Sequence, residues 1–204
     1  LELKPVTAKN GKQTITGKIE AWGEIGLAVK AYDYMDNTTN IYGVKDITLR
    51  QDSQIIYHSN LNRFAFDETR YLNSYVDYEE WKERRSFYMR SFVEPGNRLR
   101  FNESINRGII HIEEEKTYHL TYTLADAFGN TTRLSVWIEG KEQEIPEIET
   151  EGTELFHWMA DNRFGAKGIR MTIPKGNLYD DLYFRYSVKE DSTALADTHI
   201  LHNR

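Results

Sequence analysis

Two runs of alternating apolar and polar residues, at 117–124 and 131–138, constrain the fold of this chain more than any other feature. The apolar positions are Tyr118, Leu120, Tyr122 and Leu124 in the first run, and Leu134, Val136 and Ile138 in the second. A period of two is that of a β-strand with one buried face. The connecting residues 126–130 include Gly and Asn, which adopt positive φ at little cost. We therefore expect an antiparallel hairpin that covers a core.

Further strand candidates precede this hairpin, at 14–22, 25–32, 42–49 and 54–57, and another lies at 109–112. The segment Asp126-Ala127-Phe128-Gly129-Asn130 before the closing strand resembles the last hairpin of many bacterial immunoglobulin-like domains. About seven strands make one sandwich. The sequence therefore predicts a mainly β chain with an immunoglobulin-like antiparallel β-sandwich at 14–138, after an N-terminal lead-in at 1–13.

Residues 64–108 form an insertion in this sandwich that is too long for an ordinary loop. Asp77 is suited to cap a helix, with Glu80 three residues later. Aromatic and basic residues recur near helical spacing from Tyr78 to Phe92. We expect a short helix here that Pro95-Gly96-Asn97 stops.

Residues 139–152 contain six Glu and one Pro, which is typical of a solvated linker between modules. Strand candidates follow at 155–159, 169–173 and 182–188, with a turn at 174–177. Three strands in about fifty residues give a marginal core. We expect 153–204 to be a second, smaller and incomplete β module, and the chain, which begins without Met, to be a fragment of a longer protein.

The overall composition argues against several classes of partner. The net charge is −6, whereas binding to a nucleic-acid backbone needs clustered Lys and Arg. No run approaches the roughly 18 apolar residues of a membrane span, and the chain does not begin with a signal peptide. The absence of Cys excludes disulfides, thiolate metal sites and a Cys nucleophile. We expect no nucleic-acid partner and no membrane span.

No set of residues predicts an active site. His157 and Asp161 have the spacing of a zinc-ligand pair, but along one strand they stand about 13 Å apart. His199 and His202 lie at the end of the chain. There is no Gly-x-Ser-x-Gly or phosphate-binding glycine motif, and paired acids such as Glu79-Glu80 are typical of solvated turns. We therefore predict no catalytic and no metal-binding residue, and no cofactor.

The stretch with the most distinctive composition is 66–81, in which Arg, Asn and Asp are interspersed with aromatic residues. Such residues can brace the insertion against the sandwich, or they can form a face that binds a sugar or a peptide. The candidate residues for this packing or binding face are Arg70, Tyr71, Asn73, Tyr75, Asp77, Trp81, Arg84 and Arg85.

Six short motifs follow one another in an order that points to a family. They are residues 17–23 (GKIEAWG), 31–33 (AYD), 40–44 (NIYGV), 66–74 (FDETRYLNS), 91–97 (SFVEPGN) and 126–130 (DAFGN). The succession resembles the region that follows the catalytic domain in lysostaphin-type zinc metallopeptidases of the bacterial cell envelope. The resemblance spans about residues 17–140, and the tail resembles the next module of such proteins more weakly.

This resemblance implies an accessory, non-catalytic region of an exported, peptidoglycan-cleaving zinc endopeptidase. Zinc is then expected only in the peptidase domain, which this chain lacks, and the location is the cell envelope, periplasmic or extracellular. One hypothesis is that the region positions or regulates the peptidase domain, which predicts a buried Trp81. The alternative is a module that tethers the enzyme to peptidoglycan or another glycan, which predicts exposed aromatic side chains.

Overall fold

The computed structural model of the chain describes residues 2–7, 13–15, 19–34, 38–190 and 197–202. The chain is mainly β, as the alternating runs predict. Its contacts divide it into two units, one of residues 1–93 and 97–145 and one of residues 94–96 and 146–204. Each unit is described by itself.

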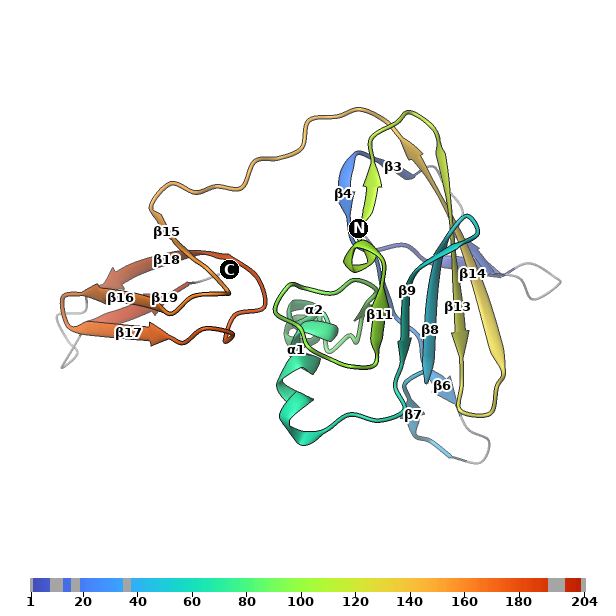
Figure 1. Cartoon of the computed structure of the whole chain (residues 1–204), viewed down its shortest axis with the longest axis horizontal. Coiled ribbons are helices and arrows are strands. Elements are labelled where there is room, and N and C mark those ends of the chain that lie inside the picture. Colours follow the sequence, from blue (N-terminus) through green and yellow to red (C-terminus); the bar gives the residue numbers. More distant parts are fainter. Residues whose placement is uncertain (1, 8–12, 16–18, 35–37, 191–196, 203–204) are drawn as a thin grey trace. The chain divides into compact units, whose positions relative to one another are not determined.

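The first unit is built on one large sheet in the strand order β1-β2-β14-β13-β8-β9-β11, with β3 also paired to β14 (Figure 1). These strands are β1 (Pro5–Thr7), β2 (Gln13–Ile15), β3 (Ile19–Ala21), β8 (Asp46–Gln51), β9 (Gln54–Asn60), β11 (Asn102–Ser104), β13 (Thr117–Ala125) and β14 (Thr131–Gly140). The predicted hairpin is confirmed, with Leu120 opposite Val136. Strand β2 pairs in parallel with β14, while the other neighbours on the main path are antiparallel.

A second layer of two small antiparallel sheets completes the predicted sandwich. Strand β4 (Gly23–Ile25) pairs with β12 (Ile110–Ile112), and β5 (Ala28–Val29) pairs with β10 (Met89–Arg90). Buried residues of both layers belong to one apolar core, because the period of two turns every second side chain inward. Leu49 and Leu120 of the main sheet and Ile112 of the second layer are fully buried. A short pair, β6 (Asp33–Tyr34) with β7 (Ile41–Tyr42), extends the unit.

Asp126 closes the turn between β13 and β14. Its Oδ1 accepts hydrogen bonds from the backbone N–H groups of Phe128 and Asn130, both at 2.8 Å. Hydrogen bonds from Asn130 lower the pKa of Asp126. Gly129 has a φ of +91°, which explains why glycine stands in this turn.

The insertion carries η1 (Phe66–Tyr71), α1 (Leu72–Tyr75), α2 (Tyr78–Arg84) and η2 (Asn106–Gly108). The expectation that one helix continues to Pro95 is wrong, because α2 ends at Arg84 and Arg85 turns into the left-handed region. Beyond it, Met89 of β10 pairs with Val29 of β5. Tyr88 and Phe92 therefore flank a short strand whose partner lies about sixty residues earlier, and tertiary pairing overrides the local helical pattern.

A buried carboxylate, that of Glu68, links the beginning of the insertion to a segment about thirty residues later. Glu68 is 5% exposed, and its two oxygens accept hydrogen bonds from the guanidinium of Arg100, both at 2.8 Å. It also accepts one from the backbone N–H of Ala65 at 2.7 Å. These bonds, with that of Arg100 first, lower the pKa of Glu68 to about 2. The side chain of Asn97 adds a hydrogen bond to Ser74, which joins α1 to the later part of the insertion.

The second unit consists of two small sheets. One has the order β15 (Thr153–Phe156), β18 (Leu182–Lys189), β19 (Thr198–Leu201), and the other is the hairpin of β16 (Asn162–Ala166) and β17 (Ile169–Ile173). Phe156 and Phe184 are its buried apolar side chains among the described residues, with ring centroids 4.7 Å apart. Strand β15 ends at Phe156, not at Met159, because the chain turns where Ala160 N–H donates to His157 C=O. Residues 141–150 carry neither helix nor strand and are exposed.

Candidate functional site

An apolar groove of about 780 Å³ opens on the first unit, beside the helices of the insertion. It is lined by Ala31, Tyr32, Ile41, Tyr42, Gly43, Leu61, Phe64, Leu72, Asn73, Tyr75, Val76, Tyr78, Trp81, Arg85, Phe87 and Met89. Separate segments thus build it: residues 31–32, residues 41–43, residues 61–64 and residues 72–89. We call it the aromatic groove.

Helix α2 forms one side of the groove. Asp77 starts this helix, since its Oδ1 accepts a hydrogen bond from the N–H of Glu80 at 3.3 Å. Residues three and four apart lie on the same face of a helix. Tyr78, Trp81 and Arg85 therefore share the face that lines the aromatic groove.

The rings on this face touch one another. The centroid of Trp81 lies 5.7 Å from that of Tyr78 and 6.3 Å from that of Phe87. The guanidinium carbon of Arg85 lies 5.0 Å from the centroid of Trp81, which is the range of a cation–π contact. Trp81 is half-buried, whereas Tyr78 and Phe87 are each 46% exposed. Trp81 is thus held between two rings with part of its surface open to the groove.

The eight residues singled out in the sequence do not form one face. Asn73, Tyr75, Trp81 and Arg85 line the aromatic groove, but Tyr75 is 5% exposed and packs edge-on against Phe101. Burial raises the pKa of the Tyr75 phenol, which is a core group at the base of the groove.

The other four residues have structural contacts elsewhere. Asp77 caps α2 and lies 3.7 Å from Arg90, while Arg84 pairs with Glu80, which raises the pKa of Arg84. Tyr71 is half-buried against the core, and the guanidinium carbon of Arg70 lies 5.3 Å from its ring centroid.

Several groove residues were not among the candidates. Those with large exposed side chains are Ile41, Tyr42, Leu61, Phe64, Tyr78 and Phe87, which are 58%, 39%, 37%, 41%, 46% and 46% exposed. Large apolar residues between turn-forming segments are the one signal that could have identified them. A cluster of exposed apolar side chains is typical of an interaction site.

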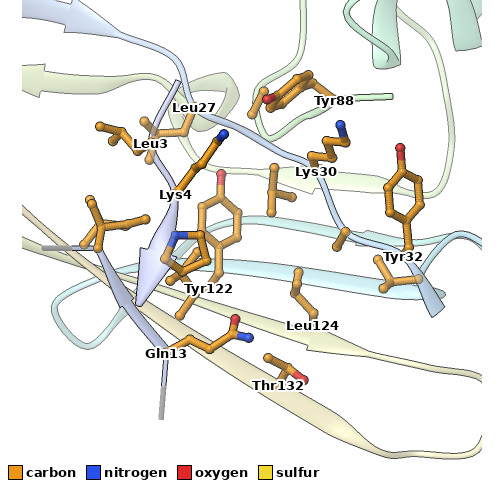
Figure 2. Close-up of a pocket in the computed structure, with 18 of the residues that line it drawn as sticks. Leu3, Lys4, Gln13, Leu27, Lys30, Tyr32, Tyr88, Tyr122, Leu124 and Thr132 are labelled. Carbon is orange, nitrogen blue, oxygen red and sulfur yellow. The ribbon is translucent and has the colours of Figure 1, made fainter. Parts of the chain in front are cut away.

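A second cavity of about 1010 Å³ lies between the two layers of the sandwich (Figure 2). Tyr122, Leu124 and Thr132 reach it from the main sheet, and Lys30 and Tyr32 from the end of β5. The ammonium group of Lys30 lies 5.8 Å from the ring centroids of both Tyr32 and Tyr88. Its remaining charged lining residues are Glu2, Lys4, Asp33, Asp77, Glu80, Arg84 and Asp126. Helix α2 therefore contributes residues to both the mixed-charge cavity and the apolar groove, which also share Ala31 and Tyr32 in their linings.

The histidines of the second unit have protein partners. The Nδ1 of His157 lies 3.2 Å from Asp181, while Asp161 accepts a hydrogen bond from the backbone of Lys175. The Nδ1 of His199 lies 2.8 Å from the Tyr186 hydroxyl. Within the described ranges no three His, Asp or Glu side chains are grouped so that they could hold a metal ion. These residues do not fit a zinc site.

None of the helices in the described part of the chain is long and apolar enough to cross a membrane. A family model described as a Zu5-like domain matches residues 153–204. The match covers strands β15 to β19, so the likeness concerns the second unit and leaves the sandwich and the groove outside it. Comparisons of the chain with curated proteins and with solved structures give no match.

Proposed function

We propose that this chain is a non-catalytic accessory region of an exported, peptidoglycan-cleaving zinc endopeptidase of the lysostaphin type. In this proposal the aromatic groove is the face that packs on the peptidase domain and positions or regulates it. The observation that carries the proposal is the groove itself, which joins the insertion to exposed apolar residues of the sandwich. The order of motifs in the sequence supplies the family.

The lining of the groove favours a protein partner. The centres of protein interfaces are enriched in Tyr, Trp, Phe, Met and Arg and depleted in Lys, Glu and Asp. In the described part of the chain the groove lining has four Tyr, two Phe, one Trp, one Met and one Arg, and it includes no Lys, Glu or Asp. Aromatic anchors in a pocket carry most of the energy of such contacts. Trp81, supported by Tyr78 and Phe87, is the anchor that this face offers.

The second candidate function is a module that binds peptidoglycan or another envelope glycan. The exposed rings of Tyr78 and Phe87 favour it, since aromatic rings stack on apolar sugar faces. Against it, a sugar site also needs polar groups that fix the orientation of the hydroxyls. Asn73 and Arg85 are the only non-aromatic polar side chains among the lining residues that the structure describes. The groove therefore supports the first proposal better.

The test is a pair of binding measurements on the whole chain. The first is calorimetric titration with the separately expressed peptidase domain of the parent protein, and the second is co-sedimentation with purified peptidoglycan sacculi. We expect binding to the peptidase domain that Trp81→Ala weakens, in a variant shown to be folded by circular dichroism. Arg84→Gln is the matched control, because Arg84 pairs with Glu80 and is not among the residues that line the groove. Sedimentation with sacculi that Trp81→Ala abolishes, without binding to the peptidase domain, would replace this proposal by the glycan-binding one.

A further inference from the structure

Arg85 occupies a backbone position that favours glycine. It follows the last residue of α2 with φ 52° and ψ 33°, in the left-handed region. Its N–H closes the helix by bonding to the carbonyls of Glu80 and Trp81. A side chain at such a position is disfavoured, so glycine is the usual residue there. Arginine at this position gives up free energy of folding that glycine would retain.

The side chain of Arg85 differs in its contacts from other arginines of the insertion. Arg84 pairs with Glu80 and Arg100 pairs with Glu68, so both guanidinium groups face a carboxylate of the chain. Arg85 instead lies over the ring of Trp81, and within the described residues no carboxylate forms an ion pair with it. Among the described residues it is also the one charged residue in the groove lining. An apolar groove thus carries a single positive charge at its aromatic anchor.

We propose that Arg85 determines which partner the aromatic groove accepts. This inference rests on the proposed function and names the chemistry of the partner. The partner is a protein segment that inserts an apolar side chain against Trp81 and presents a carboxylate next to it. Charge complementarity favours this partner, since the described lining has one guanidinium and no acid, and such a surface attracts an acid and repels a cation.

Arginine suits this role better than lysine. A planar guanidinium can stack on an indole and still offer its edge to both oxygens of a carboxylate. The ammonium group of a lysine lacks this flat fork of donors. A contact of this kind, partly shielded by the surrounding rings, would hold the partner in one orientation.

Arg85→Gly tests the inference, because glycine suits the left-handed backbone and keeps the N–H bonds of the cap. We expect an unchanged or higher melting temperature and an affinity for the peptidase domain at least about tenfold lower. Raising the salt from about 0.15 M to about 1 M should lower the affinity of the wild type for the peptidase domain more than that of the variant. Arg85→Lys should bind with intermediate affinity. Arg84→Gln should leave affinity unchanged.

The outcomes separate the two proposals. If Arg85→Gly binds as tightly as the wild type while Trp81→Ala does not bind, the inference is overturned and the proposed function stands. If the wild type does not bind the peptidase domain, both are overturned. If Arg85→Gly proves less stable than the wild type, Arg85→Asn, which also tolerates positive φ, replaces it in the same measurement. Wild-type affinity in a folded Asn variant would then overturn the inference.

Discussion

The two units of the chain make their cores in different ways. In the first unit, long strands pair over most of their length, and Leu49 and Leu120 are fully buried between the two layers. In the second unit, Phe156 and Phe184 stack, and Leu155 and Leu201 remain 40% exposed each. We therefore expect the first unit to stay folded after the loss of one core contact, whereas the second unit depends on a few aromatic rings.

This difference bears on where function can reside. A rigid sandwich can hold a surface groove in one shape, because the groove residues are attached to elements that are themselves fixed. Within the insertion, hydrogen bonds from the guanidinium of Arg100 to the buried carboxylate of Glu68 hold two distant segments together. The second unit has fewer buried contacts with which to hold such a surface.

The largest effect is expected in the second unit. Phe184→Ala removes a side chain that is 3% exposed and that contacts Phe156 and Phe164, at a cost of roughly 3–5 kcal/mol. We expect residues 153–202 to unfold while the sandwich remains intact. Two-dimensional NMR of the amides resolves the two parts. Leu155→Ala, at a partly exposed position, is the control. If the amide signals of the second unit stay dispersed in Phe184→Ala, the second unit does not depend on its few buried rings.

In the first unit, Leu120→Ala opens a cavity at a fully buried position. The free energy of unfolding should fall by roughly 2–5 kcal/mol, without unfolding in the absence of denaturant. Urea denaturation followed by the circular dichroism of the sandwich measures it. Thr121→Ala, on the outer face of the same strand, should have little effect. Complete unfolding of Leu120→Ala in buffer would show that the first unit has no greater free energy of unfolding than the second.

A smaller, local effect is expected from the Glu68 carboxylate. Its pKa in the folded chain is about 2, below its ordinary value of 4.5. The ionised form therefore stabilises the insertion fully above the ordinary value, and this contribution is lost as the pH falls towards 2. The protection of amides against hydrogen exchange, relative to the intrinsic exchange rate at each pH, should fall at 65–100 over this range and fall less in β13. Glu68→Gln should remove this pH dependence, and an unchanged profile in the variant would contradict the assignment.

The smallest effect is expected at the start of α2. Asp77→Ala should cost about 1 kcal/mol, because the N–H of Glu80 loses its acceptor. Since Trp81 lies one turn later in the helix, its fluorescence should change when the start of the helix frays. Asp77→Asn retains a capping oxygen and should behave like the wild type. Identical denaturation curves for Asp77→Ala and the wild type would argue against this cap.

The hairpin and the cap could be predicted because their signals are local. Alternation along β13 and β14 fixes which side chains turn inward, and Asp77 precedes its helix directly. The groove could not be predicted as a unit, since it brings Tyr42 beside residues of the insertion such as Phe87. The end of α2 was missed because Met89 pairs with Val29, a contact that no window around the helix contains. Long-range pairing, rather than propensity, decides both.

The most direct test of the central claim is hydrogen exchange of the whole chain with and without the peptidase domain of its parent protein. The account predicts slower exchange at residues 72–89 and around Tyr42 when the peptidase domain is present, and no change on the turn at Gly129. Unchanged exchange around the groove, at concentrations where the two proteins form a complex, would contradict it.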